Sequence, residues 1–522
     1  MYIYMPEIYW FDDRRAITCL DIQQTPYPST RVREVEYNCD RYYKLATVGV
    51  SGEVRIWEYC YEIHPQKPLK VEFIANLDGH QGAVNCCKFS PNGGFYTRYV
   101  SGQYLASGDA YGGLITWFHC DETPLPEPAA DLELPPNKEN WKQYRKGSLR
   151  HASDVTCLAW SSCSQFLASA SNDDSIVVQD ILNGKVLWSL RNFRHFPVGL
   201  AWDPRGKYLV SFSTDRRLDI LDTKKSNKLR SAFAVEKLNV SVNGIQTSPD
   251  MPYKLFHDFQ LACFARTIDF SPCGSLLLVP TAHLELPGHN VYGTYVFRRS
   301  DLDKCRPHAL IPSTKATILA RASPVVYPLR KEVEENFLGL PYRVVFAVMT
   351  VDTVILHDSQ SRAPFMYIDN LHYDNLTSLC WTPDGKSMAV SSMEGYNTFI
   401  VLPAKKMGET MPIPEEVTGR DSPILKKPKA PKAVKETTEN TEEPKKKKGK
   451  KDSEEETTPK KTPSAKQSTP KSAATQGTPS LFKFFAPVNP KRDGSPVSSK
   501  TTMVMASKSK KKIETVVLGD VE

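Results

Sequence analysis

The chain has 522 residues, of which 40% are apolar and 24% are charged, a composition typical of a globular protein rather than a membrane protein. Its net charge of +8 is unevenly distributed: residues 404–522 hold 26 basic and 16 acidic residues, which leaves 41 basic and 43 acidic residues in 1–403. The C-terminal part also holds 13 of the 39 prolines. We therefore expect a near-neutral folded body at 1–403 and a disordered basic tail at 404–522.

Several classes of protein are excluded by motifs that the sequence does not contain. The 12 cysteines lie in the body without a CxxC pair, so neither a zinc site nor a thioredoxin-type motif is predicted. The phosphate-binding, dinucleotide-binding, HExxH and GxSxG motifs are also missing, so no enzyme, cofactor or metal is expected. No apolar run approaches the ~20 residues of a membrane span, and the N-terminus does not resemble a signal peptide, so neither a membrane association nor secretion is expected.

A short pattern recurs along the body. Each copy has an apolar segment, often followed by a turn of the Ser/Asp-Pro-x-Gly type, then a segment ending in small residues and a third ending in an aromatic residue or Asp. Apolar and polar residues alternate, and Val, Ile, Thr and aromatic residues are common, so the segments are predicted β-strands. Long loops are predicted at 121–136 and 224–257. The first strands of the seven copies lie at Ile17–Ile22, 83–89, 154–160, 198–202, 266–270, 324–329 and 376–381.

Seven such units predict an all-β fold, a seven-bladed β-propeller in which neighbouring blades cover each other's faces. His80 ahead of the second copy, and Trp57 and Trp117 in third strands, resemble the marks of WD40 repeats. His80 is expected to hold blades together through hydrogen bonds rather than to act on a ligand, and so are the turn residues Asp173 and Asp215.

The last copy, at 376–402, lacks an outer strand, so the ring needs a strand from elsewhere in order to close. The segment Met1–Trp10 has apolar residues at Ile3, Met5 and Ile8 and precedes the first full copy. We therefore predict that this N-terminal strand pairs with the last blade.

Five stretches are more particular than a generic repeat: Lys-Glu-Asn-Trp at 138–141, Phe-His-Asp at 256–258, and the segments 271–280, 340–348 and 370–373. Together they resemble the middle, WD40-containing subunit of chromatin assembly factor 1, and the resemblance covers residues 1–403. It implies a non-enzymatic scaffold in the nucleus, associated with the large and small subunits of that complex. Such a complex deposits histones H3 and H4 on newly replicated DNA.

Two other functions are kept as alternatives. Subunits of the replication-independent, HIRA-type histone chaperones share the propeller, but they continue into a second long domain that is not seen in this sequence. A WD40 substrate receptor of a ubiquitin ligase would need an adaptor-binding element outside the ring, and no such element is visible in the sequence.

The predicted tail contains a dense basic cluster, for which we predict nuclear import and weak, salt-sensitive contact with DNA phosphates. The cluster consists of Lys445, Lys446, Lys447, Lys448, Lys450 and Lys451. Proline-directed kinases could add negative charge around it. The candidate phosphorylation sites are Ser422, Thr458, Thr462, Thr469, Thr478 and Ser495.

The only aromatic residues of the tail lie in one short segment. Leu481, Phe484 and Phe485 resemble the box with which ligands bind the sliding clamp PCNA, although Thr478 stands where that box usually has Gln. Exposed phenylalanines favour a partner pocket, since they have no core of their own. The alternatives are a chance apolar cluster or a ligand for another partner.

A second short ligand is predicted near the end of the sequence. Lys511 and Lys512 precede Ile513, and β-branched residues lead from there to Leu518, a pattern suited to adding a strand to an exposed sheet edge. It resembles the motif that binds the anti-silencing function 1 chaperone, in which Ile513 and Leu518 would fill apolar pockets. The motif usually has Arg at the basic pair, and Lys keeps the charge but not the bidentate geometry.

Overall fold

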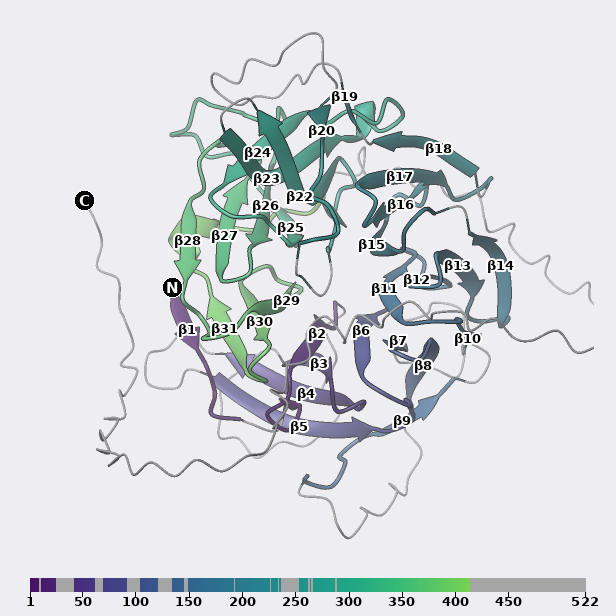
Figure 1. Ribbon diagram of the computed structural model, residues 1–522. Coiled ribbons are helices and arrows are strands. Elements are labelled where there is room, and N and C mark those ends of the chain that lie inside the picture. Colours follow the sequence, from purple (N-terminus) through teal and green to yellow (C-terminus); the bar gives the residue numbers. More distant parts are fainter. Residues whose placement is uncertain are drawn as a thin grey trace, which may run out of the picture. The chain divides into compact units, whose positions relative to one another are not determined.

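The computed structural model describes residues 1–413 except 9–10, 25–41, 62–68, 92–103, 121–133, 145–148, 192, 226, 233, 236–252, 262, 264–265 and 287–288. Within these residues the chain forms seven antiparallel sheets of four or five strands, each a blade, and a two-stranded ribbon; the seven blades are arranged as a ring (Figure 1). The predicted seven-bladed β-propeller is therefore confirmed. No helix in the described part of the chain is long and apolar enough to cross a membrane.

The blades are numbered in chain order. Blade 1 contains β2 (Ile17–Ile22), β3 (Tyr43–Gly49), β4 (Val54–Tyr61) and β5 (Leu69–Leu77). Blade 2 contains β6 (Val84–Phe89), β7 (Tyr104–Asp109), β8 (Gly113–Cys120), β9 (Asn140–Gln143) and β10 (Leu149–Arg150). Blade 3 contains β11 (Val155–Trp160), β12 (Phe166–Ser171), β13 (Ser175–Asp180) and β14 (Lys185–Leu190). Blade 4 contains β15 (Pro197–Trp202), β16 (Tyr208–Ser213), β17 (Arg217–Asp222) and β18 (Asn227–Ala232).

Blade 5 contains β21 (Asp269–Phe270), β22 (Leu276–Leu286), β23 (His289–Arg298) and β24 (Ala309–Ser313). Blade 6 contains β25 (Leu319–Tyr327), β26 (Arg343–Met349), β27 (Thr353–Asp358) and β28 (Met366–Asp369). Blade 7 contains β29 (Leu376–Trp381), β30 (Ser387–Ser392), β31 (Asn397–Val401) and, as its outer strand, β1 (Tyr2–Tyr4).

The N-terminal strand closes the ring. β1 pairs antiparallel with β31, with Tyr2 opposite Val401 and Tyr4 opposite Phe399. The predicted pairing with the last blade is present, although it uses three residues rather than the whole ten-residue segment. This pairing gives blade 7 a fourth strand and covers an edge that would otherwise be exposed.

The hydrophobic core lies between neighbouring blades. Phe256 packs between Phe212 of blade 4 and Tyr295 of blade 5, with ring centroids 4.8 Å and 5.5 Å away respectively. Tyr59 of blade 1 packs against Phe399 of blade 7 at 4.9 Å. Because every such cluster is shared by two sheets, each blade depends on its neighbours for stability.

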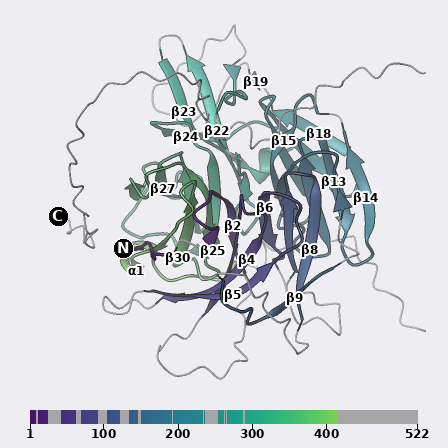
Figure 2. The same ribbon diagram turned by 60° about the horizontal axis from the view of Figure 1, so that its bottom comes forward.

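Two sequence-based boundaries within the ring need correction. The inner strand of blade 6 was expected at 324–329, whereas β25 starts at Leu319 and its register shifts between Ala322 and Val326. Pro324 lies in this irregular stretch, where its missing N–H disrupts no ladder bond. The predicted loop at 224–257 contains the outer strand β18 and a short ribbon of β19 (Ala234–Val235) and β20 (Tyr253–Lys254). The long hairpin of β22 and β23 lies beside this ribbon (Figure 2).

The folded body continues past the predicted boundary at Pro403. Residues 404–413, here called the C-terminal strap, begin with the short helix α1 (Ala404–Met407) and pack on blade 6. Met407 is 3% exposed, and the Met411 N–H donates to the carbonyl of Val326 at 2.9 Å. The sequence hides this contact because its few apolar residues are separated by Lys, Glu and Pro. All the predicted tail motifs follow the strap, at positions outside the described residues.

Candidate functional site

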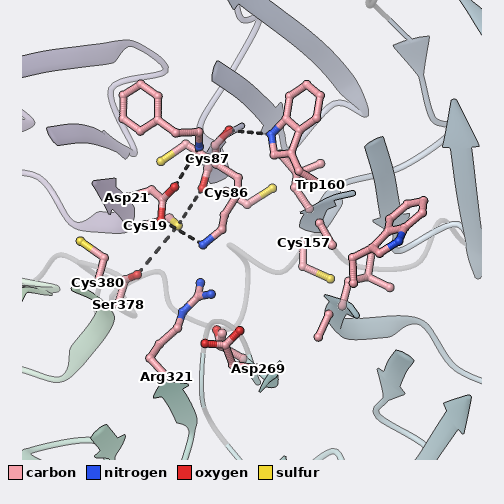
Figure 3. A pocket seen from close by; sticks show the side chains of 18 of the residues that line it. Cys19, Asp21, Cys86, Cys87, Cys157, Trp160, Asp269, Arg321, Ser378 and Cys380 are labelled. Carbon is pink, nitrogen blue, oxygen red and sulfur yellow. Dashed lines mark hydrogen bonds and ion pairs between the residues drawn. The ribbon is translucent and has the colours of Figure 1, made fainter. Parts of the chain in front are cut away.

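The inner strands of the blades line a central cavity of about 510 Å³ (Figure 3). Two kinds of functional group gather there, charged side chains and thiols. The charges come from Asp21 of β2, Lys88 of β6, Asp269 of β21 and Arg321 of β25. Figure 3 shows Arg321 and Asp269 from one side of the cavity and Asp21 with the cysteines from the other.

Each of the two acidic residues in the cavity bonds to the backbone of the next blade. Asp21 accepts the Phe89 N–H at 2.8 Å and pairs with Lys88 at 3.0 Å. Asp269 accepts the Ala322 N–H at 3.0 Å. Burial raises the pKa of Asp269. Burial acts to lower the pKa of Arg321, but the negative groups near it, Asp269 first, outweigh this effect, and the net result is a raised pKa. The two carboxylates therefore join neighbouring strands instead of forming an acid–base pair aimed at a substrate.

Five thiols also line the cavity: Cys19, Cys86, Cys87, Cys157 and Cys380. Burial raises the pKa values of four of them, that of Cys157 to about 12. The hydrogen bond to Cys87 instead lowers the pKa of Cys19 to about 6, although burial opposes this change. Among the described residues, no group of three or more His, Cys, Asp or Glu side chains could hold a metal ion.

A belt of side-chain hydrogen bonds connects the inner strands of blades 7, 1, 2, 3 and 4. Each donor lies in one blade and its acceptor is a backbone carbonyl of the next, so the bonds fix the spacing between blades. The pairs are Thr18 with Val84, Asn85 with Val155 at 3.0 Å, Thr156 with Pro197 at 2.6 Å, and Ser378 with Leu20 at 3.5 Å. The last of these joins blade 7 to blade 1.

His80 lies in a buried network, as the sequence predicted. Its Nδ1 lies 2.8 Å from Asp109 and its Nε2 lies 2.6 Å from the Ser107 hydroxyl, which also accepts the Trp117 indole N–H at 2.8 Å. The Asp109 carboxylate accepts the Gly113 N–H at 2.7 Å. The network therefore joins the segment before blade 2 to its two central strands.

Two further histidines, which the sequence pattern did not identify, have similar surroundings. His151 contacts Ser169 at 2.8 Å and lies 3.4 Å from Asp173, while His372 contacts Ser392 at 3.1 Å and Thr398 at 2.9 Å. Burial lowers the pKa values of both. A positional signal could have found them: His80, His151 and His372 each stand four positions before the first residue of an inner strand.

The Lys-Glu-Asn-Trp stretch at 138–141 connects blades 1 and 2 through an ion pair. Glu139 accepts both hydrogen bonds from the Lys44 ammonium, at 2.6 and 2.7 Å, and a third from the Trp141 indole at 3.0 Å. Lys44 is 3% exposed, so this carboxylate helps to compensate a buried charge. Burial acts to raise the Glu139 pKa, but Lys44, His119 and the Trp141 hydrogen bond together outweigh it and lower the pKa.

The 340–348 and 370–373 stretches also have structural roles. Arg343 is buried beside Asp358, at 3.4 Å, and donates hydrogen bonds to the carbonyls of Lys406 and Met407 in the C-terminal strap. In the second stretch His372 is buried in its network, whereas Tyr373 is 97% exposed.

The site residues predicted for the tail are not among those the structure describes, so they stay predictions. They are the import lysines at 445–448 and 450–451, the six phosphorylation candidates, the clamp-binding candidates Leu481, Phe484 and Phe485, and the chaperone-binding candidates Lys511, Lys512, Ile513 and Leu518.

Seven four- or five-stranded blades in a ring, with buried histidine networks of the His80 type in blades 2, 3 and 7, define a WD40-type β-propeller. The comparisons give the family. Residues 1–407 match the model of the CAF1B/HIR1 β-propeller domain, and the chain belongs to this family.

Several relatives carry the name of chromatin assembly factor 1. The B-type subunit of that factor from Gallus gallus is 35% identical over 398 residues, which cover 74% of this chain and 67% of the relative. The FAS2 homologue from Oryza sativa subsp. japonica is 33% identical, over 70% of this chain and 69% of the relative. The B-type subunit from Mus musculus is 35% identical, over 70% of this chain and 63% of the relative.

A more distant group of relatives is named HIR1. The protein from Gibberella zeae is 27% identical over 67% of this chain, but the match covers 32% of that longer relative. This identity is lower than that of the Gallus gallus and Mus musculus proteins, and the match covers a smaller share of the relative.

Proposed function

We propose that the chain is a non-enzymatic scaffold subunit of a nuclear chromatin assembly complex. The observation that carries this proposal is a family match over the whole propeller, with relatives named as B-type subunits of chromatin assembly factor 1 at 35% identity. The cavity chemistry supports a scaffold, because Asp21 and Asp269 are both engaged in bonds between blades. Such charges stabilise the ring and are not available for proton transfer.

In this proposal the propeller binds the large and small subunits of the complex, which together deposit histones H3 and H4 on newly replicated DNA. A replication-independent, HIRA-type chaperone is the second candidate. The relatives of that type are 24–27% identical and are covered over 32–43% of their own length, whereas the relatives named for chromatin assembly factor 1 are 27–35% identical and covered over 63–85%, so the replication-coupled type is favoured.

The tail would recruit the histone donor. Ile513 and Leu518 would anchor an extended strand on the anti-silencing function 1 chaperone, and Lys511 and Lys512 would speed association with its acidic surface. The C-terminal strap supports this arrangement, because it fixes the start of the tail on blade 6. Ile413, the last described residue, lies among those lining the central cavity.

The other tail motifs would place the complex in the nucleus and at replication sites. The lysines at 445–451 would carry the import signal and contact DNA weakly, and Leu481, Phe484 and Phe485 would bind the sliding clamp. Phosphorylation at the Ser/Thr-Pro sites would reduce the charge of the tail.

Affinity purification of the intact protein from replicating nuclei tests the proposed complex. We expect the large and small chromatin assembly subunits with histones H3 and H4. Recovery of HIRA-type subunits or of a ubiquitin ligase adaptor in their place would contradict the proposal and support one of the two alternatives.

A synthetic peptide covering residues 507–522 tests the chaperone contact separately. We expect micromolar binding to the anti-silencing chaperone by calorimetry, since an extended peptide loses conformational entropy when it binds. Replacing Ile513 and Leu518 by Ala removes both anchors and should abolish the heat of binding. Unchanged affinity of the doubly substituted peptide would show that this motif is not the contact.

A further inference from the structure

The outer strand of blade 3 exposes two neighbouring apolar side chains. β14 (Lys185–Leu190) is the last strand of its sheet, with β13 on one side, and it lies at the outer rim of the ring (Figure 1). Val186 is 50% exposed and Leu187 is 49% exposed. Neighbouring residues of a strand normally face opposite sides, and both are exposed here because the register with β13 shifts between Val178 and Gln179.

Several other outer strands carry protection against edge pairing. β24 contains Pro312, β28 has four residues, β1 has three, and β5 has the charged residues Lys70 and Glu72 within it. Proline, short length and internal charge are the usual devices that prevent a sheet edge from binding another strand. β14 has six residues, with neither proline nor charge after its first position, although the register shift opposite Val178 and Gln179 interrupts its pairing with β13. Of the devices named above it carries none, and its exposed apolar side chains favour the addition of a further strand.

Charge at the ends of this edge indicates what it would accept. Lys185 begins the strand, Arg191 follows it, Arg194 lies three residues further on, and all three are exposed. A strand running beside β14 would bring its flanks close to these cations, so acidic flanks are favoured and basic flanks are not.

The same charges argue against two occupants from this chain. An antiparallel pair of β14 strands from two copies would place the cationic ends of one copy beside those of the other. The two apolar segments of the tail are also basic, with Lys483 in the first and Lys511 and Lys512 in the second. Neither occupant matches the rim in charge.

We propose that the outer edge of β14 is a docking site for an extended segment of a partner protein, with apolar side chains at alternate positions and acidic residues at its flanks. The segment adds a fifth strand to blade 3 through main-chain hydrogen bonds, and its apolar side chains cover Val186 and Leu187. This surface goes beyond the proposed function and is independent of the tail motifs.

The test uses the full chain and a designed fluorescent peptide. The peptide has alternating valine and threonine in the centre and two glutamates at each end, and a matched peptide has lysine in place of glutamate. By fluorescence anisotropy we expect the acidic peptide to bind about fivefold or more tightly than the basic one, with a difference that shrinks at high salt. Equal binding of both peptides would overturn the proposal.

Substitutions locate the binding to this edge. Val186→Ser with Leu187→Ser should weaken the acidic peptide about tenfold or more, because the two changes remove the apolar contact and leave the charge of the edge unaltered. Tyr367→Ser, on the outer strand of blade 6, where Tyr367 is 53% exposed, is the matched control and should leave binding unchanged. Unchanged binding by the Val186/Leu187 variant would contradict the assignment.

A charge reversal gives an independent result. Lys185→Glu with Arg191→Glu changes two exposed side chains, so the fold should persist and the preference should switch to the lysine peptide. A persistent preference for the acidic peptide would overturn the proposal.

Sedimentation of the protein without peptide tests whether the edge binds a second copy of the chain. A dimer that the Val186/Leu187 variant abolishes would assign the edge to that second copy and overturn the proposal. None of these readouts depends on whether chromatin assembly subunits co-purify.

Discussion

The inner wall of the propeller and its outer rim differ in how they use polar groups. On the inner wall, Asp21, Asp269 and the belt of hydroxyl and amide donors each bond to a neighbouring blade. On the rim, the cations at the ends of β14 are exposed and frame an apolar strand. The contrast teaches that buried charge in this fold serves stability, whereas recognition is to be sought at exposed edges and in the tail.

The largest effect should come from breaking a buried ion pair that joins two blades. Glu139→Ala leaves the Lys44 ammonium buried without its carboxylate and should lower the free energy of unfolding by about 3–5 kcal/mol. Lys44→Met with Glu139→Leu removes both charges and should recover most of that loss. Thermal or denaturant unfolding measures both variants. A single variant as stable as the parent would show that solvent reaches this pair.

The second prediction concerns how the free energy of unfolding changes with pH because of a buried histidine. His357 is 3% exposed and stacked on Phe346, and burial lowers its pKa from 6.5 to about 4, against the weaker effect of Asp358. The unfolded chain therefore binds this proton more readily. The associated stability is complete above pH 6.5 and is lost as the pH falls from 6.5 towards 4, with a magnitude of about 3 kcal/mol.

His357→Phe should remove this part of the pH dependence, because phenylalanine retains the ring but does not titrate. Chemical unfolding of parent and variant at several pH values between 4 and 7 measures the difference. Parallel stability curves for the two proteins would mean that His357 does not titrate in this range.

The smallest effect is expected on the exterior. Tyr373 is 97% exposed although it adjoins the buried His372, so Tyr373→Ser should change the free energy of unfolding by less than about 0.5 kcal/mol. His372→Ala, its matched neighbour, breaks bonds to Ser392 and Thr398 and should cost about 1–3 kcal/mol. Equal losses of unfolding free energy in the two variants would contradict the assignment of His372 to the interior and Tyr373 to the surface.

Much of the ring could be predicted from the sequence because inner strands such as Ile17–Ile22 repeat an alternating apolar pattern before a turn. The pattern fails where geometry is irregular. The bulge around Pro324 hid the start of β25, and β18 lay within a polar stretch that resembled a loop. Met407 is buried by tertiary contact with blade 6, which no local pattern reveals.

The candidate site was harder to predict than the fold. The sequence of β14 has the apolar character of a buried strand, and its exposure follows from its position at the end of the sheet and from the register shift. Likewise, the resemblance marked residues 138–141 but not their role, which requires Lys44 from a distant strand. Exposure and partner choice are properties of the assembled ring.

Ring closure by β1 also orders events during protein synthesis. Tyr2 is synthesised almost 400 residues before its partner Val401. At about 5–20 residues per second, translation alone separates the two by roughly 20–80 s. For that interval β1 has no strand to pair with, while the six earlier blades can already assemble. The last blade thus joins strands that are made far apart in time, and nascent chains that stop before residue 397 cannot form this closure.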